Sequence, residues 1–223
     1  SLIEKNSLKE IQFYITTRYS CGYINGQDAQ SIVATPYKNI NSINFNNLMS
    51  KGFRRSGQYV YKPNCKNCNA CIPIRILALN FNASRSQKRL KKYLDKLSVK
   101  LLPLTFDKEH YNLYVNYQNK RHQNNGEAEN SIDDYNEFLI KSNVNSKLVE
   151  FRLNNQLKMV TIIDIMNDGI SAVYTFYDCN DQKISLGTMS IIWLLEFCKK
   201  ENLSFLYLGY WIHESQKMKY KTN

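Results

Sequence analysis

Apolar residues recur at helical spacing in several segments of the chain. In residues 84–100 four of them follow the pattern i, i+3, i+4 and i+7, which places them on one face of a helix. They are Leu90, Tyr93, Leu94 and Leu97. Ser84 or Ser86 stands at the start of this run and can cap the predicted helix.

Three further helices are predicted along the chain. Two cover residues 108–122 and 131–141. The third begins near Ser185 or Thr188 and ends before Asn202, with four apolar residues on one face. They are Ile191, Leu194, Leu195 and Cys198.

Runs rich in β-branched and aromatic residues predict strands in the second half. Residues 158–166 and 170–178 are two such runs, separated by a short segment that contains Asp168 and Gly169. Asp-Gly at this position is a strong hairpin signal. A third run, residues 204–212, follows the last predicted helix. Hairpin, crossover helix and strand is the order expected for a mixed α/β sheet.

The fold class predicted from these patterns is α+β, with an N-terminal module that contains four of the six cysteines. We expect an N-terminal domain over residues 1–83, a basic helix and connector over 84–103, and a mixed-sheet C-terminal domain over 104–223. The chain has 223 residues, which is enough to bury a sizeable core. No apolar run approaches a membrane span and no signal peptide is visible at the start, so a cytoplasmic protein without a membrane partner is expected.

The charge is distributed unevenly. The net charge is +11, but residues 1–100 hold 17 basic and 4 acidic residues, whereas residues 101–223 hold 13 and 15. Such a basic half attracts nucleic acid, acidic lipid or acidic protein segments. Abundant Lys can also reflect the base composition of the coding DNA, although the asymmetry argues against that alternative.

The basic residues of segment 84–100 lie opposite its apolar face. Cations in the first turn of a helix oppose its macrodipole, so a surface that meets phosphates explains them better than a merely solvated face. An ordinary solvated face remains the alternative. The predicted phosphate contacts are Arg85, Lys88, Arg89, Lys91, Lys92 and Lys96.

Cys65, Cys68 and Cys71 form a C-x-x-C-x-x-C pattern. Thiolates at this spacing can turn back onto one ion, and Cys21 can supply a fourth ligand from a distance. The sequence therefore predicts a zinc ion or an iron–sulfur cluster at these four cysteines and does not choose between the two. Reduced thiols in a turn are the alternative.

Two arginines, Arg54 and Arg55, lie in a loop-like segment bounded by Gly52 and Gly57. Paired guanidinium groups suit the recognition of carboxylate or phosphate, and a solvent-facing turn is the alternative. Other chemistries are poorly supported, because the chain has no H-E-x-x-H motif, no Ser/His/Asp motif and no phosphate-binding glycine-rich loop.

Taken together, these segments resemble the aminoacyl-tRNA-protein transferase family, which appends Arg or Leu to protein N-termini. The similarity extends in order over nearly the whole chain. The longer matching segments are GFRRSG at 52–57, YKPNCKNCNACIPIR at 61–75, SRSQKR at 84–89, DGISAVYTFYD at 168–178, SLGT at 185–188 and YLGYWI at 207–212. Shorter ones are Cys21-Gly22-Tyr23, Tyr117, Arg121-His122, Ser215, Lys217-Met218 and Tyr220-Lys221.

The triple-cysteine arrangement resembles the bacterial aspartate/glutamate leucyltransferase branch. This resemblance implies transfer of Leu from Leu-tRNA to the N-terminal amine of proteins that start with Asp or Glu, which marks them for degradation in the N-degron pathway. It also implies an acetyltransferase-like (GNAT-like) fold for the C-terminal domain, no cofactor required for transfer, and aminoacyl-tRNA and acidic protein N-termini as partners.

The resemblance also implies site residues. Candidates for proton relay or adenosine contact, chosen in matched segments, are Tyr174, Asp178, Tyr210 and Tyr220. Arg54, Arg55 or Arg75 is expected to hold the acidic side chain of the substrate N-terminus. Lys217 and Lys221 are expected to join the basic helix in binding tRNA. No segment is identified as the pocket for the leucyl side chain.

Three other functions remain as alternatives. Arginyl transfer from Arg-tRNA is the first, and a donor pocket lined by carboxylates would favour it. The second is a noncatalytic RNA-binding module that senses redox state through Cys65, Cys68 and Cys71. The third, a small-molecule acetyltransferase, is disfavoured because Ser185-Leu186-Gly187-Thr188 stands where a coenzyme A enzyme of this fold carries a glycine-rich loop.

Overall fold

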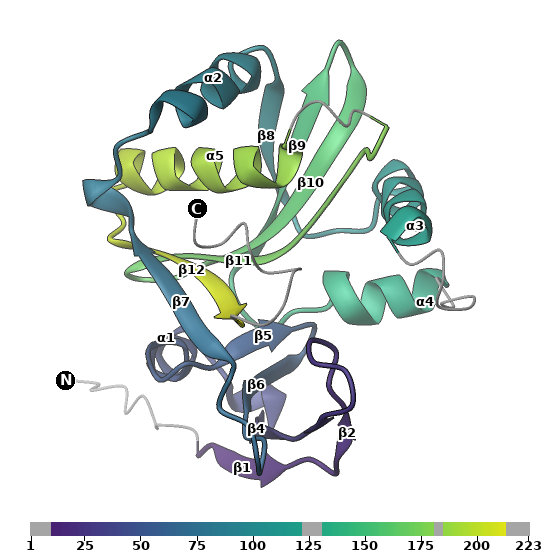
Figure 1. Ribbon diagram of the computed structural model, residues 1–223, viewed down its shortest axis with the longest axis vertical. Coiled ribbons are helices and arrows are strands. Elements are labelled where there is room, and N and C mark those ends of the chain that lie inside the picture. Colours follow the sequence, from purple (N-terminus) through teal and green to yellow (C-terminus); the bar gives the residue numbers. More distant parts are fainter. Residues whose placement is uncertain (1–9, 122–130, 181–184, 213–223) are drawn as a thin grey trace, which may run out of the picture.

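The computed structural model describes residues 10–121, 131–180 and 185–212. Two lobes are built on separate sheets (Figure 1). The lower lobe in that view contains a four-stranded sheet and helix α1 (Ser42–Ser50). The upper lobe contains a six-stranded sheet with helices on both faces. Among the described residues, no helix is long and apolar enough to cross a membrane.

The four-stranded sheet is antiparallel and carries a small hydrophobic core on one face. Its strands, in spatial order, are β1 (Gln12–Ile15), β4 (Ser31–Thr35), β6 (Tyr59–Pro63) and β5 (Arg54–Ser56). Ala34 and Val60 are register partners on the face that packs against Phe45 and Met49 of α1. Side chains alternate between the two faces of a strand, so Val33, Tyr59 and Tyr61 lie on the opposite face.

The six-stranded sheet contains one parallel pair among antiparallel ones. Its order is β7 (Ile72–Leu77), β12 (Phe205–Trp211), β11 (Gly169–Tyr177), β10 (Gln156–Ile165), β9 (Ser146–Leu153) and β8 (Ser98–Pro103). The parallel strands β11 and β12 pair only between Gly169–Ser171 and Phe205–Tyr207. Beyond Ser171 and Tyr207 they are no longer paired with each other, so the sheet opens towards the carboxyl ends of these strands.

Both faces of this sheet are covered. Helices α2 (Arg85–Leu94) and α5 (Leu186–Lys200) lie on one face, and α3 (Lys108–Arg121) and α4 (Ile132–Tyr135), with a π-helical turn at Asn136–Ile140, lie on the other. On β10 the buried side chains alternate accordingly. Met159 and Ile163 face α5, and Val160 and Ile162 face α3.

The remaining elements are short. They are the strand pair β2 (Tyr19–Ser20) and β3 (Asp28–Ala29) and the 3-10 turns Tyr37–Asn39 and Ala78–Asn80.

Most of the predicted elements are confirmed. Strands β10 and β11 form the Asp-Gly hairpin, and the crossover through α5 to β12 produces the mixed sheet. Ser84 caps α2 in a full capping box with Gln87. Asn202 ends the segment after α5 with a φ of 56°, the left-handed conformation expected beyond a helix terminus.

Two local predictions are wrong. The helix predicted within residues 84–100 ends at Leu94, and residues 98–103 form β8, because pairing with β9 satisfies their backbone groups. Leu97 is still buried, but from a turn rather than from a helical face. The arginine segment is not a loop either, since Arg54–Ser56 is strand β5, paired with β6.

The proposed division of the chain at residue 83 stays a prediction. Strand β7 precedes that position and yet pairs with β12 in the upper sheet, so it runs from the lower lobe to the edge of the upper one (Figure 1).

Candidate functional site

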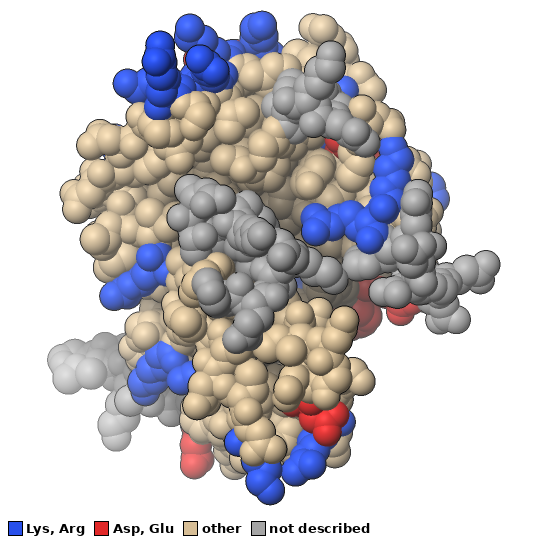
Figure 2. Space-filling view, viewed as in Figure 1, with Lys and Arg blue, Asp and Glu red and all other residues tan. Residues whose placement is uncertain are grey.

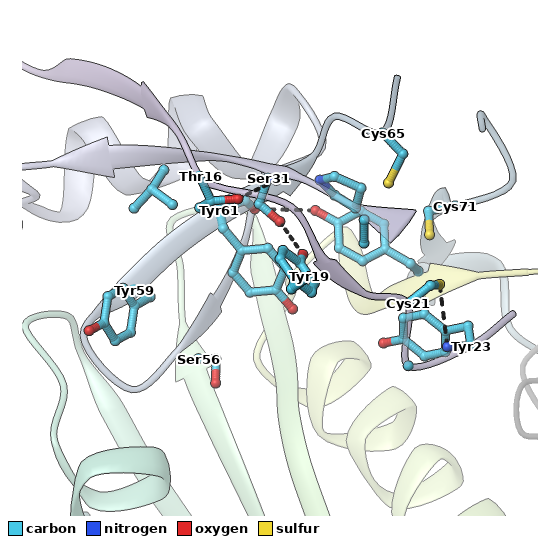
Figure 3. A pocket seen from close by; sticks show the side chains of 15 residues that line it. Thr16, Tyr19, Cys21, Tyr23, Ser31, Ser56, Tyr59, Tyr61, Cys65 and Cys71 are labelled. Carbon is cyan, nitrogen blue, oxygen red and sulfur yellow. Dashed lines mark hydrogen bonds between the residues drawn. The ribbon is translucent and has the colours of Figure 1, made fainter. Parts of the chain in front are cut away.

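A pocket of about 430 Å³ opens on the face of the four-stranded sheet that points away from α1. Fifteen residues line it, and Figure 3 shows side chains from β2, β4, β5 and β6 around it. Tyr210 of β12 also lines the pocket. Five are tyrosines, namely Tyr19, Tyr23, Tyr59, Tyr61 and Tyr210. We call this cavity the tyrosine pocket.

Several hydroxyl groups of the tyrosine pocket bond to neighbouring protein groups. The Tyr19 hydroxyl lies 2.7 Å from Ser31 Oγ. Thr16 Oγ1 accepts from the Ser31 amide at 3.0 Å. Tyr210 donates to the carbonyls of Gly52 at 2.5 Å and Tyr61 at 3.2 Å. The pocket wall therefore consists mainly of tyrosine rings and short side chains, and the hydroxyls of Thr16, Tyr19, Ser31 and Tyr210 already have protein partners.

Three of the four predicted metal ligands, Cys21, Cys65 and Cys71, lie at one end of the tyrosine pocket (Figure 3). Burial raises the pKa of Cys71 to about 11, and the proximity of Cys65, Cys21 and Cys68 adds to this shift. The Cys71 thiol is therefore protonated and uncharged at neutral pH. Cys21 Sγ accepts weak hydrogen bonds from the Tyr23 and Ile24 amides at 3.5 and 3.4 Å.

These cysteines do not fit the predicted zinc ion or iron–sulfur cluster as they are arranged. None of the four forms a disulfide. In residues 10–121, 131–180 and 185–212, no group of three His, Cys, Asp or Glu side chains is placed to hold a metal ion. The metal centre is not supported, and no step of the reaction is assigned to it.

Arg55 lies on the α1 side of the four-stranded sheet and is fully engaged within the protein. Its Nε and Nη2 atoms donate to the two carboxylate oxygens of Asp164 at 2.7 and 2.8 Å, and both side chains are almost completely buried. Nη2 also donates to Ser146, and Nη1 to the carbonyls of Gly57 and Lys141. These bonds use the donor capacity of the guanidinium group and leave none for a substrate carboxylate.

Arg54 is buried on the same sheet face as the tyrosine pocket, since its register partner is Tyr61. Its guanidinium donates to three backbone carbonyls, and no carboxylate among the described residues forms an ion pair with it. Burial lowers its pKa. Its Nε atom is buried without a hydrogen-bond partner in the described structure. Arg54 therefore places a buried positive charge beneath Tyr61 and Tyr210.

Arg75 is the accessible member of the three arginines. It lies on β7, where its side chain is exposed and its guanidinium stands 4.0 Å from the ring centroid of Phe205. Phe205 and Tyr207 lie on the adjacent β12.

The three predicted catalytic residues that the structure describes, Tyr174, Asp178 and Tyr210, do not meet in one site. Tyr210 lines the tyrosine pocket, whereas Asp178 lines a separate polar groove between α3 and the hairpin and lies 3.7 Å from Lys158 Nζ. Tyr174 is packed among aromatic rings and accepts a 2.6 Å hydrogen bond from Gln118. Burial raises the pKa of both Tyr174 and Tyr210, so both phenols stay protonated at neutral pH. Tyr220, Lys217 and Lys221 lie outside the described residues.

The basic residues of α2 form one exposed face. Figure 2 shows Lys and Arg side chains gathered at the top of the molecule, over α2. Arg85, Lys88, Arg89 and Lys92 are exposed, and Lys96 is exposed just beyond the helix. Lys91 is half-buried and lies 3.7 Å from Glu196 of α5. This basic face lies in the upper lobe, away from the tyrosine pocket.

Sequence reasoning missed most of the tyrosine pocket. In the sequence, Tyr59 and Tyr61 indicate only an aromatic strand, and Tyr19 and Val33 do not stand out. The spacing of two residues, at Ser31 and Val33 and at Tyr59 and Tyr61, is the available signal, because such residues share one face of a strand. The sequence does not show which face of the four-stranded sheet carries the pocket, because Tyr210 of the other sheet forms part of the wall.

Comparisons with known proteins match both halves of the chain. Residues 19–89 match the family described as "Arginine-tRNA-protein transferase, N terminus", and residues 109–223 match "Arginine-tRNA-protein transferase, C terminus". Among solved structures, L-PGS from Bacillus licheniformis is similar with a TM-score of 0.45 and 11% identity, covering 75% of this chain and 50% of that one.

Several curated bacterial proteins are similar over almost the whole chain. The aspartate/glutamate leucyltransferase of Methylobacillus flagellatus is 51% identical over 97% of this chain and 87% of its own length. The proteins of the same name from Chromobacterium violaceum and Hahella chejuensis are 44% and 39% identical, each over 98% of this chain and over 90% and 93% of their own lengths. The chain therefore belongs to the aminoacyl-tRNA-protein transferase family, in the branch of the bacterial aspartate/glutamate leucyltransferases.

Proposed function

We propose that this protein transfers Leu from Leu-tRNA to the N-terminal amine of proteins that begin with Asp or Glu. The observation that carries the proposal is the 51% identity over 97% of the chain to a protein named for that activity. Its partners are then an aminoacyl-tRNA and acidic protein N-termini, and transfer needs no cofactor.

The opening between β11 and β12 supports an acyltransferase arrangement like that of the acetyltransferases. Ligands of open α/β sheets bind at the carboxyl ends of strands, where neighbouring strands part. Here β11 and β12 part after Ser171 and Tyr207, and Tyr210 lies on the diverging portion. We place the ester of the charged tRNA at this opening.

The reaction is an aminolysis of an ester. The α-amine of the substrate attacks the carbonyl carbon, a C–N bond forms, the C–O bond breaks, and the ribose hydroxyl leaves with a proton that the amine has lost. An α-amino group titrates near ~7.7–8.0, so part of it is already nucleophilic at neutral pH. The protein then contributes mainly orientation and stabilisation of the oxyanion. Tyr174 and Tyr210 remain protonated and suit positioning better than proton abstraction.

Among the three predicted arginines, we assign the acidic side chain of the substrate to Arg75. It is exposed, whereas Arg55 is committed to Asp164 and Arg54 is buried. The buried Arg54 adds to the positive potential near Arg75. The Arg54 guanidinium lies 5.5 Å from the ring centroid of Tyr207, a neighbour of Arg75 on β12. Arg75→Gln should raise the KM for an Asp-starting peptide more than it lowers kcat.

A transfer assay tests the proposed function directly. Purified protein is mixed with radiolabelled Leu-tRNA and an Asp-starting peptide, with Arg-tRNA and an Ala-starting peptide in parallel reactions. Leu should appear on the Asp peptide alone. Transfer from Arg-tRNA instead would support an arginyltransferase, and tRNA binding without transfer would support a noncatalytic module.

The basic face of α2 is assigned to the tRNA backbone. Where the RNA is duplex-like, removing one phosphate contact should flatten the slope of log K against log salt by about 0.9. Replacing Lys88, Arg89 and Lys92 together by Gln should therefore weaken tRNA binding and flatten the slope by roughly two to three, measured by filter binding across a salt series. Lys38, Lys51 and Lys66 replaced by Gln form a charge-matched control away from α2. An unchanged slope in the α2 variant would contradict the assignment.

A further inference from the structure

The proposed reaction requires three recognition sites, and the tyrosine pocket fits only one of them well. The protein must hold the acidic side chain of the peptide, the terminal nucleotides of the tRNA and the side chain of the transferred amino acid. The chemistry of the pocket wall can distinguish among these.

Among the described residues, no Lys, Arg, His, Asp or Glu side chain lines the tyrosine pocket. An acidic side chain placed there would lose its hydration without a cation in this wall, which is strongly unfavourable. An arginyl side chain would meet no carboxylate among these fifteen lining residues. An uncharged side chain therefore fits this wall better than a charged one.

Two of the tyrosine hydroxyls in the wall already have protein partners, which favours an apolar occupant over a strongly polar one. Those of Tyr19 and Tyr210 are engaged with Ser31 and with the carbonyls of Gly52 and Tyr61. A nucleobase presents several donors and acceptors that need partners when buried, whereas an aliphatic side chain needs none. Val33 supplies an aliphatic surface to the same wall. An aliphatic side chain gains free energy here simply by leaving water.

The pocket also lies where the acyl group is needed. Tyr210 belongs to β12 beyond Tyr207, the last residue paired with β11, and it forms part of the pocket wall. The same side chain bonds to Gly52 and Tyr61 of the lower lobe, so the pocket adjoins the opening in the upper sheet. An ester placed at that opening can extend its side chain into the pocket.

We propose that the tyrosine pocket binds the leucyl side chain of the aminoacyl-tRNA and so selects the donor. This inference rests on the proposed function and names the part of its substrate that the pocket takes. Leu is then preferred over Arg because the described wall of the pocket is apolar and uncharged and offers no carboxylate.

Filling the pocket from two different strands tests the proposal. Val33→Phe on β4 and Ser56→Phe on β5 both add a ring to the wall, and Ser42→Phe at the exposed start of α1 is the matched control. We expect kcat/KM for Leu-tRNA to fall at least tenfold in both pocket variants. The KM for the Asp peptide and the Kd for uncharged tRNA should stay within twofold of the wild type, and thermal melts confirm folding. A rise in the peptide KM alone, or unchanged kinetics, would overturn the proposal.

A binding measurement separates the pocket assignment from the proposed function. The probes are non-hydrolysable 3′-amide analogues of adenosine that carry a leucyl or an arginyl group, titrated calorimetrically. The wild type should bind the leucyl probe at least tenfold more tightly than the arginyl one, and Val33→Phe should abolish this preference. Probe selectivity without any transfer would count against the proposed function alone. Equal binding of both probes would reject the pocket assignment alone. The same holds if Val33→Phe and Ser56→Phe transfer Leu with the kcat/KM of the wild type.

Discussion

At the scale of single residues, the buried His110 is held by the carboxylate of Glu150, a pairing that the sequence did not indicate. His110 of α3 is 2% exposed, and its Nε2 atom lies 2.6 Å from Glu150 Oε2 on β9. Arg152 donates to the other oxygen of Glu150 at 2.8 Å and also pairs with Glu109. The hydrogen bond from Arg152, followed by that from His110, lowers the pKa of Glu150. The carboxylate therefore connects the helix to the sheet.

This arrangement predicts a specific loss of stability in acid. Because the pKa of Glu150 is lower in the folded than in the unfolded protein, its contribution is complete above the unfolded value of ~4.3 and is lost as the pH falls through the lower folded value. Glu150→Gln should reduce the free energy of unfolding by about 1.5–3 kcal/mol at pH 7. The difference in this free energy between wild type and variant should become smaller below about pH 4. Urea unfolding across a pH series measures this. Glu196→Gln, in the half-exposed pair with Lys91, is the control. A difference in the free energy of unfolding that does not change with pH would contradict the linkage.

At the scale of elements, α2 shows how a helix can begin despite unfavourable charge. Its first turn contains Arg85 and Lys88 and no acidic residue, which opposes the macrodipole. Ser84 Oγ accepts from the Gln87 amide, and the Gln87 side chain accepts from the Ser84 amide in return. The capping box thus stabilises a helix start whose cations remain exposed for binding.

Removing the cap should destabilise the protein measurably. Ser84→Ala should lower the free energy of unfolding by about 1 kcal/mol, because the first-turn amide loses its partner. Ser98→Ala, at an exposed position of β8, is the matched control and should stay within about 0.5 kcal/mol of the wild type. Chemical denaturation compares the two. Equal stability of both variants would show that the cap contributes nothing.

At the scale of the whole molecule, the two lobes are joined by buried polar groups. Arg55 of the lower sheet and Asp164 of β10 are 109 residues apart and form a bidentate pair, which Ser146 completes at 2.5 Å from Asp164 Oδ1. Tyr210 adds hydrogen bonds from β12 to the lower lobe. These contacts set the relative position of the tyrosine pocket and the opening between β11 and β12.

Breaking the buried pair should be strongly destabilising. Asp164→Asn leaves the Arg55 charge buried without its counterion, and the free energy of unfolding should fall by about 3–5 kcal/mol. Lys91→Gln removes one partner of the half-exposed pair with Glu196 and should change the free energy of unfolding by less than about 1 kcal/mol. Urea unfolding measures both variants. A decrease below about 1 kcal/mol for Asp164→Asn would contradict the joining role.

The sequence by itself determined the elements whose signals are local. The Asp-Gly hairpin, the Ser84 cap and the apolar faces of the helices depend on residues a few positions apart, and the structure confirms them. The same local reasoning extended the α2 helix too far, because the pairing of β8 with β9 involves residues about fifty positions away. Local patterns could not show that residues 98–103 would pair with β9 instead of extending the helix.

Only the tertiary structure decided what the chemically suggestive residues do. Arg54 and Arg55 are adjacent in sequence, but strand alternation turns Arg55 towards Asp164 and Arg54 towards the pocket side of the sheet. The cysteine spacing was equally suggestive, yet the thiols lie at the end of a pocket without a metal-holding arrangement among the described residues. Burial and long-range partners set the charge state and availability of a side chain, and these arise only when distant segments pack together.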